Sequence, residues 1–327
     1  MTTSTNARPQ SIAICALFRN SARYLDYFRA VASAQAREDI NLVFSFVEGD
    51  STDDSYARLK AWASDDPRVH LTKVDVEPVT DFADRVTKWA MLGNVAVEQA
   101  LQTGCDRVLW CESDLVLPND LLEQLVAEPC DIVAPAIYLG SMFYDTWGFR
   151  GLDGNRFANV EPYHPEFRHH ALVPLSSVGS CVLFRREIFD QGVRFRGTYD
   201  DGLLVGVCRD AAALGFRTFM DSRVAVLHPT SQWRKQQYRM SRVDVEYSRP
   251  ETKEVLARAA QQIVAQINIA IGSVDLSSDH PVFEPVHTVV RRHLGATPYT
   301  VRVRLASERN KQYALTLSDI PQSLVAP

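Results

Sequence analysis

The chain has 327 residues, of which 46% are hydrophobic and 23% are charged, and its formal net charge is −5. This balance excludes a disordered or fibrous protein and gives no electrostatic reason to expect generic nucleic-acid binding. Because the length exceeds one ordinary core, we expect a large α/β domain over residues 1–248 and a smaller appendage over residues 249–327.

The cysteines and the apolar runs bear on where in the cell the protein is located. The six cysteines lack zinc-type spacing, and most lie in apolar segments where a reduced thiol packs as a small hydrophobe. Residues 1–10 are polar, and no run of about 20 apolar residues follows that could span a bilayer. We therefore expect a cytoplasmic protein without a membrane span; the sequence is compatible with a homo-oligomer.

The first element is an apolar run over residues 11–18, typical of a central parallel strand, and an amphipathic helix follows over residues 24–34. The break between them, Arg19-Asn20-Ser21, matches neither G-x-G-x-x-G nor G-x-x-x-x-G-K-[ST]. The sequence therefore lacks the main motif that would identify a dinucleotide-binding protein or a P-loop protein. Asn20 and Ser21 are also candidates for capping the helix.

The next elements repeat this alternation. Residues 40–47 read as a second strand, ended by a polar cluster that begins at Glu48 and leads into a helix over residues 56–64. Residues 52–54 are expected to serve as turn and cap residues, since short polar side chains satisfy free N–H groups at helix starts.

A third strand is predicted over residues 69–74, and a long helix over residues 81–103. On this helix Arg85 and Lys88 are three residues apart and therefore share one face. Two cations placed there could reach a diphosphate; an ordinary solvated basic face is the alternative.

The most informative stretch is the short apolar strand Val108–Trp110, which stops on Glu112-Ser113-Asp114 before a helix that opens near Leu121. The carboxyl ends of strands form the ligand crevice in open α/β sheets. Two acids there could hold a hard divalent cation against phosphate oxygens. The alternative is a plain turn with surface carboxylates.

Residues 131–138 predict a further strand that would extend a parallel sheet. The segment 144–151 then alternates aromatic and polar residues, with Tyr144, Asp145 and Trp147. Aromatic faces stack on sugar rings while a carboxylate accepts hydrogen bonds from sugar hydroxyls, so the segment is a candidate sugar site. An aromatic loop packed on the sheet is weighed equally.

Residues 152–174 read as a loop over the active face, and its histidines are expected to face solvent rather than a metal; they are His164, His169 and His170. Residues 175–184 combine a small-residue turn with a strand, in which Gly179 would permit close backbone approach to a ligand.

Asp200 and Asp201 precede a helix predicted over residues 205–214, where a cap role is the alternative to a catalytic one. Strands are expected over residues 217–220 and 224–230, and the second carries His228. Beyond them, residues 251–271 predict a helix, and the alternating pattern around residues 299–305 predicts a hairpin.

Glu112-Ser113-Asp114 resembles the DxD-type motif of nucleotide-sugar glycosyltransferases with the GT-A fold, with Glu in place of the commoner Asp at the first position. The order of elements over residues 11–230 resembles the same family, and Tyr-Asp-x-Trp is similar to a segment of fungal mannosyltransferases of the Anp1/Mnn9 and capsule-associated types. The resemblance implies a GT-A-like, Rossmann-like fold, in which a mostly parallel mixed sheet is flanked by helices. The appendage would be a small α+β unit.

The resemblance also implies roles for individual residues. Asp114, His228 and Glu112 would hold Mn²⁺, or Mg²⁺, and neutral imidazole suits Mn²⁺ better. Donor contacts would come from the nucleotide-side residues Arg19, Asn20, Glu48, Arg85 and Lys88, and from the sugar-side residues Tyr144 and Trp147. Gly179 would allow a ligand to approach the backbone in a segment that resembles the acceptor side of these enzymes. Catalytic roles at the acceptor would fall to Asp201, Asp200 and Asp145.

Together these features predict a metal-dependent glycosyltransferase of the hexosyltransferase type. It would move a sugar from a GDP- or UDP-linked donor to an unidentified hydroxyl acceptor, and the mannosyltransferase resemblance favours retention of configuration. Two alternatives stay open: a nucleotidyltransferase, which usually carries a Gly-rich phosphate loop that this chain lacks, and a non-catalytic sugar-binding module, with which Glu112 is most compatible.

Overall fold

The computed structural model describes residues 9–76, 78–139, 142–198 and 202–228 with their side chains, and the backbone of three further strands. Asp200, Asp201 and the predicted helix over residues 251–271 lie outside the described residues. Within the described part of the chain, no helix is long and apolar enough to cross a membrane.

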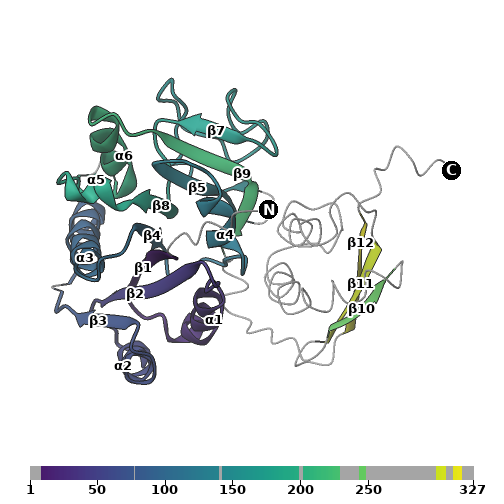
Figure 1. The fold of residues 1–327 in the computed structure, drawn as a ribbon, viewed down its shortest axis with the longest axis horizontal. Helices are drawn as coiled ribbons and strands as arrows, with labels where there is room; N and C mark the ends of the chain where they lie inside the picture. The colour runs from purple at the N-terminus through teal and green to yellow at the C-terminus, as the bar shows by residue number, and fades with distance from the viewer. Residues whose placement is uncertain are drawn as a thin grey trace, which may run out of the picture.

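The main sheet has nine strands (Figure 1). In chain order they are β1 (Gln10–Phe18), β2 (Ile40–Glu48), β3 (Val69–Lys73), β4 (Arg107–Cys111), β5 (Ile132–Leu139), β6 (Met142–Phe143), β7 (Leu172–Leu175), β8 (Cys181–Arg185) and β9 (Thr218–Leu227). In space the order is β3-β2-β1-β4-β8-β5-β9-β7, with β6 paired to β5.

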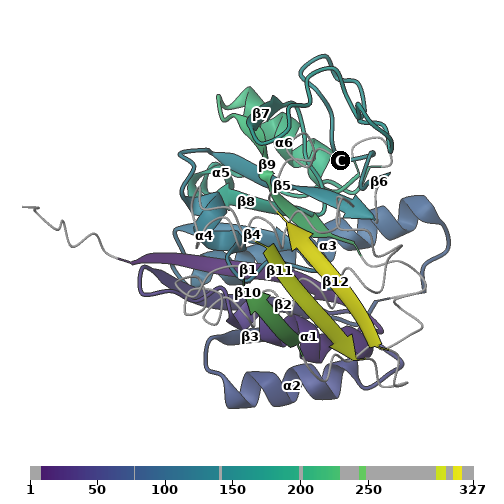
Figure 2. The same ribbon diagram turned by 90° about the vertical axis from the view of Figure 1, so that its right-hand side faces the viewer.

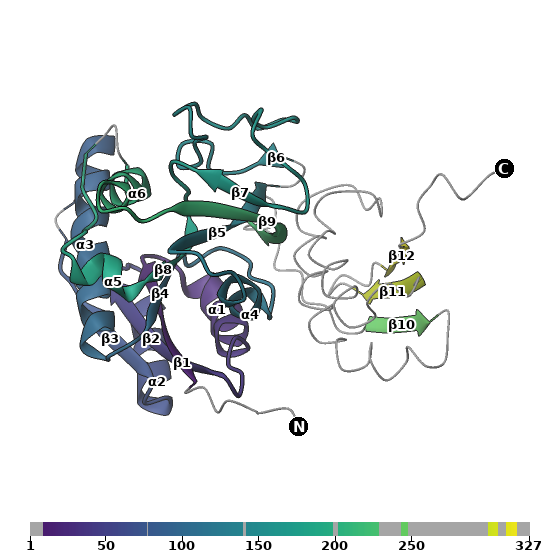
Figure 3. The ribbon, with the colours of Figure 1, turned by 45° about the horizontal axis from the view of Figure 1, so that its top comes forward.

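The helices around it are α1 (Ala22–Ser33), α2 (Ser55–Asp65), α3 (Phe82–Gln102), α4 (Leu121–Val126), α5 (Arg186–Asp190) and α6 (Leu204–Ala213). Figure 3, like Figure 1, shows α3, α5 and α6 on one side of the sheet and α1 and α4 on the other. Strands β3, β2, β1 and β4 are mutually parallel, as is β5 with β9, whereas β6, β7 and β8 pair antiparallel. The expected mixed α/β sheet flanked by helices is confirmed.

Two details of the sheet differ from the expectation. First, β5 does not extend the parallel strands directly, because β8 lies between β4 and β5 and is antiparallel to both. Second, the two strands predicted over residues 217–220 and 224–230 are one strand, β9. The polar residues between them stay extended because the backbone N–H of Ser222 donates to the carbonyl of Ala171, and a register shift between Pro135 and Ala136 accommodates the irregularity.

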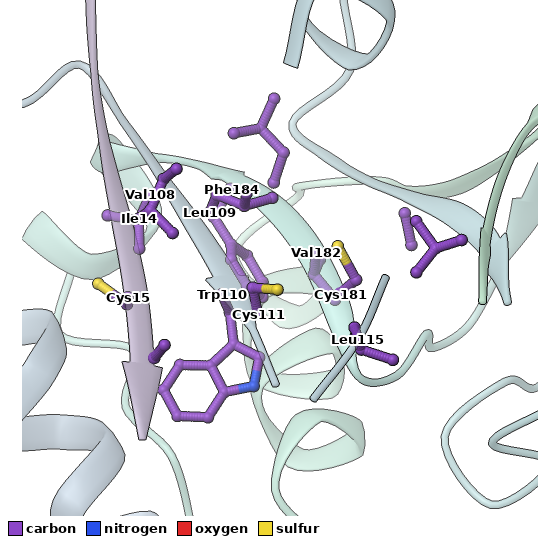
Figure 4. Close-up of a cluster of buried hydrophobic side chains, with 14 of the residues drawn as sticks. Ile14, Cys15, Val108, Leu109, Trp110, Cys111, Leu115, Cys181, Val182 and Phe184 are labelled. Carbon is purple, nitrogen blue, oxygen red and sulfur yellow. The ribbon is translucent and has the colours of Figure 1, made fainter. Parts of the chain in front are cut away.

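The core is built from the apolar faces of these elements. Four aromatic rings from β1, β2, α1 and α2 pack together with neighbouring centroids 5.0–6.5 Å apart: Phe18, Phe28, Phe46 and Trp62. Figure 4 shows the centre of the sheet, where Trp110 and Cys111 end β4 and Cys181 of β8 is the register partner of Cys111. All six cysteines are buried and free, as expected of reduced thiols.

A second, antiparallel sheet contains β10 (Val243–Tyr247), β11 (Thr300–Ala306) and β12 (Gln312–Ser318), and Figure 2 shows these three strands side by side. The pairing of β11 with β12 confirms the predicted hairpin. β10 precedes residue 248 and pairs with β11 beyond it. The division of the chain into residues 1–248 and 249–327 stays a prediction.

Candidate functional site

A cavity of about 760 Å³ opens at the carboxyl ends of β1 and β4. Its walls come from the loop between β1 and α1, the first half of α3, the segment after β4, and single residues from elsewhere, such as Tyr144 and His228. Cavities of about 300–1,000 Å³ are typical of small-molecule sites. The cavity lies at the sheet edge at which the sequence predicts ligand binding.

An acid–histidine group forms one wall of this cavity. Side-chain ligand atoms of Glu112, Asp114 and His228 all lie within 4.8 Å of one another, and His228 Nε2 is 3.7 Å from Asp114 Oδ2. Two carboxylates and an imidazole are donors that suit Mn²⁺. These three residues therefore fit the divalent cation that the sequence predicts.

Backbone pairing explains why His228 reaches Asp114. Val116, just after the acidic motif, donates its N–H to the carbonyl of Leu227 at 2.9 Å, and Leu227 donates back at 3.2 Å. The end of β9 is thereby tied to the segment that follows β4. The N–H of His228 also donates to the carbonyl of Tyr138 on β5 at 2.8 Å, which fixes the backbone from which the imidazole extends.

Tyr144 packs against the imidazole of this group. Its ring is stacked on His228, with centroids 4.0 Å apart and planes inclined by 24°. Its backbone N–H donates to the carbonyl of Ile137 on β5 at 2.8 Å, so the backbone from which the ring extends is fixed to the sheet. Tyr144 lines the cavity, and one face of its ring is covered by the imidazole of His228; its contact with a donor stays a prediction.

A basic wall completes the cavity. Arg19, Arg85 and Lys88 all line it, which confirms that Arg85 and Lys88 share a face of α3. Lys88 Nζ lies 2.7 Å from Asp84 Oδ2 and also donates to the carbonyl of Pro78 at 2.9 Å. The ammonium group of Lys88 holds the pKa of Asp84 below its usual value. Cations that share a cavity with a metal-compatible acidic group suit a phosphate-bearing ligand.

Asn20 joins two loops beside the cavity, and Glu48 holds the turn that follows β2. Asn20 lines the cavity in the left-handed conformation, with φ 52°, and its Oδ1 accepts from the N–H of Thr52 at 2.8 Å. Glu48 is fully buried at the end of β2, outside the cavity lining, and its Oε1 accepts from the N–H of Ser51 at 2.6 Å. Asp53 also serves as a turn and cap residue, as predicted, since it accepts from the N–H groups of Ala22 and Ser55.

The remaining sugar-site candidates lie behind the cavity wall. Asp145 accepts from the N–H of Gly148 at 3.0 Å and from Ser180 Oγ at 2.6 Å. Burial raises the pKa of Asp145, and these two hydrogen bonds oppose that rise. This carboxylate packs against the backbone of Gly179. A Cβ atom added at position 179 would lie only 1.8 Å from Asp145 Oδ2, so the contact requires glycine.

Trp147 also lies outside the cavity lining. The guanidinium of Arg156 lies over its ring, 3.7 Å from the centroid. The indole nitrogen of Trp147 lies close to Gly202, the residue after Asp201: a Cβ atom added at Gly202 would be 3.1 Å from it.

The expectation that the loop histidines face solvent is wrong for His164. Its side chain is only 2% exposed, and its ring stacks on Phe157 with centroids 4.9 Å apart. The loop has its own aromatic core, in which Phe143 contacts Phe157 and Tyr163, and His164 is buried against it. His169 is exposed, as expected.

Several residues of the site were not anticipated from sequence. Trp89, Trp110 and Cys111 line the cavity, and Ser180, the residue before β8, contacts the acidic motif. Trp89 could have been found, because it follows Arg85 by four residues on the same helix face. Ser180 carries no local signal, since its position depends on the alignment of β8 with β4.

The fold and the cavity together define an α/β protein with an acid–histidine group and a basic wall at the carboxyl edge of its sheet. Comparison of the sequence with protein-family models and with curated proteins gives no match. Among solved structures, the mannosyltransferase PcManGT from Pyrobaculum calidifontis, in complex with GDP-mannose and Mn²⁺, is similar at 18% identity and a TM-score of 0.44, over 89% of this chain and 71% of that chain.

The TarS 1–349 structure from S. aureus is similar at 14% identity and a TM-score of 0.44, over 87% of this chain and 71% of that chain. Its complex with UDP-GlcNAc matches at 13% identity and a TM-score of 0.42, over 87% of this chain and 72% of that chain. At identities this low, the chemistry of the site has to be inferred from its own residues.

Proposed function

We propose that this chain is a metal-dependent glycosyltransferase that moves a sugar from a nucleoside-diphosphate sugar to a hydroxyl-bearing acceptor. The observation that carries the proposal is that one cavity contains both the Glu112–Asp114–His228 group and the cationic side chains of α3. A divalent cation bound by the three residues would stabilise the charge that develops on the departing nucleoside diphosphate.

The chain's own residues would bind and orient the donor. Arg19, Arg85 and Lys88 would contact phosphate oxygens, since charge-assisted hydrogen bonds are the strong ones. Tyr144 would border the donor while it packs against His228. Asn20 would shape the nucleotide side through its hydrogen bond to the loop after β2.

The first prediction tests donor binding. GDP-mannose and UDP-N-acetylglucosamine should be screened by thermal unfolding with Mn²⁺, Mg²⁺ or EDTA. A ligand at 100 times its Kd stabilises the folded state by about 2.7 kcal/mol. The matching donor should therefore raise Tm by about 4–5 °C with Mn²⁺ and much less with EDTA.

Product analysis with the same donors separates the alternatives. Release of free nucleoside diphosphate from the nucleotide sugar supports the proposal. If the protein is instead given a sugar phosphate and a nucleoside triphosphate as substrates, formation of a nucleotide sugar with release of pyrophosphate would indicate a nucleotidyltransferase. Binding without turnover would indicate a sugar-binding module. If none of the nucleotide sugars shifts Tm under any condition, the proposed function is contradicted.

The second prediction concerns stereochemistry. We propose retention of the anomeric configuration, as the mannosyltransferase resemblance implies, with Asp200 and Asp201 as polar anchors for donor or acceptor hydroxyls. Asp201→Asn should then raise KM more than it lowers kcat. NMR of the product should show the donor's anomeric configuration. An inverted product together with a loss of turnover of about 10²–10⁴-fold would instead make Asp201 a general base.

A further inference from the structure

Ser180 lies between two carboxylates, one inside the cavity and one behind it. Its Oγ is 2.6 Å from Asp145 Oδ2 and 3.3 Å from Glu112 Oε1, and the residue is 3% exposed. A hydroxyl group has one hydrogen to donate. Because charge-assisted O–H···O bonds are about 2.5–2.7 Å long, the shorter contact identifies Asp145 as the main acceptor of that hydrogen.

The surrounding backbone holds this arrangement in place. The N–H of Gly148 donates to Asp145 Oδ1 at 3.0 Å, and the carbonyl of Ser180 accepts from the N–H of Glu112 at 3.1 Å. Gly179 packs directly against the Asp145 carboxylate. Asp145 and Ser180 both adopt the left-handed conformation, with φ 58° and 56°. Non-glycine residues keep this uncommon conformation only where their surroundings impose it.

We propose that Asp145 is a positioning residue for the cation site, because it holds the Ser180 hydrogen away from Glu112 Oε1. The inference rests on the proposed function, which supplies the cation. Without the Asp145 carboxylate, the Ser180 hydroxyl would turn to Glu112 and compete with a cation for that oxygen. The adjacent Tyr144 packs on His228, so two consecutive residues act on the acid–histidine group: Tyr144 contacts His228 directly, and Asp145 reaches Glu112 through Ser180.

The third prediction uses Asp145→Asn, which preserves the shape of the side chain. The N–H of Gly148 donates to Asp145 Oδ1, and only an amide oxygen can replace that acceptor, so the new amide oxygen should face Gly148 and the amide NH₂ should face Ser180 Oγ. Ser180 would then accept this hydrogen bond and donate to Glu112. We expect Mn²⁺ affinity to fall by about 10–100-fold, the range for residues that support metal ligands. Electron paramagnetic resonance of free Mn²⁺, with GDP or UDP present, measures this affinity without requiring turnover.

Removing the hydroxyl group distinguishes this role from a purely structural one. Ser180→Ala alone should keep Mn²⁺ affinity within about threefold of wild type, since no competing donor remains. Ser180→Ala added to Asp145→Asn should restore most of the affinity that Asp145→Asn loses. A structural role predicts that the double variant binds no better than Asp145→Asn. Asp153→Asn is the matched control: its side chain is 44% exposed and pairs with His164 rather than with the acid–histidine group, so Mn²⁺ affinity should stay at the wild-type value.

The outcomes separate the inference from the function on which it rests. If wild-type protein takes up no Mn²⁺ with either nucleotide, the proposed function fails and the inference fails with it. If wild-type protein binds Mn²⁺ and Asp145→Asn binds it equally well, only the inference is overturned. A loss of about tenfold or more in Ser180→Ala alone would also overturn it, because Ser180 would then assist Glu112 directly.

Discussion

Asp114→Asn is expected to reduce Mn²⁺ affinity by about 10²-fold or more, because loss of groups that merely support a metal ligand already costs about 10–100-fold. The variant keeps the size of the side chain but removes the negative charge next to His228. Metal assistance contributes several kcal/mol to stabilising transition-state charge, so sugar transfer should slow by about 10³-fold. Calorimetric titration with Mn²⁺ and a nucleoside diphosphate measures the first effect, and release of nucleoside diphosphate measures the second.

The matched control is Asp26→Asn, an exposed acid on α1 that pairs with Arg58 and lies outside the cavity lining. It removes the same charge and should leave Mn²⁺ affinity and transfer unchanged. Equal Mn²⁺ dependence in wild type and Asp114→Asn would remove Asp114 from the metal site.

Gly179→Ala is expected to cause the largest loss of stability among these variants. The added Cβ atom would lie 1.8 Å from Asp145 Oδ2 and 2.5 Å from its Cγ, far inside van der Waals contact. Overpacking typically costs about 1–3 kcal/mol, and each hydrogen bond lost when Asp145 is displaced adds about 1 kcal/mol. We expect the free energy of unfolding to fall by about 2–4 kcal/mol, measured by urea denaturation.

Two further variants test this cause. Gly154→Ala introduces a side chain at φ 80° where no atom lies within 4 Å, so it adds backbone strain without overlap and should cost only about 1–2 kcal/mol. Asp145→Ala in the Gly179→Ala background removes the overlapping carboxylate and should recover part of the loss. If the double variant is less stable than Gly179→Ala by the full effect of Asp145→Ala, the two residues do not interact and the explanation is wrong.

Local periodicity was sufficient to predict most elements near the site. The predicted strands over residues 11–18, 40–47 and 69–74 and the helix over residues 81–103 agree with β1, β2, β3 and α3 to within one residue at each end. Strand ends and helix faces are local properties, because side chains alternate along a strand and recur every three to four residues along a helix. These local properties were enough to predict the acidic motif at the end of β4 and the shared face of Arg85 and Lys88.

Strand order could not be predicted in the same way. An apolar run fits any interior position of a sheet, so nothing local indicated that β8 separates β4 from β5. That insertion places Ser180 beside Glu112, and the Tyr144–Asp145 segment reaches Ser180 from elsewhere in the chain. For the same reason the burial of His164 was missed, since its aromatic partners come from a loop without a regular period.

The sequence by itself determined the α/β class, the acids at the end of a central strand and the cations on α3, because each depends on residues close together in the chain. Only the tertiary structure decided how these residues meet. The pairing of Val116 with Leu227 brings His228 to Asp114, and the pairing of β8 with β4 puts Ser180 between Glu112 and Asp145. Such contacts depend on which strands become neighbours, and that choice is made by packing of the whole sheet rather than by any one segment.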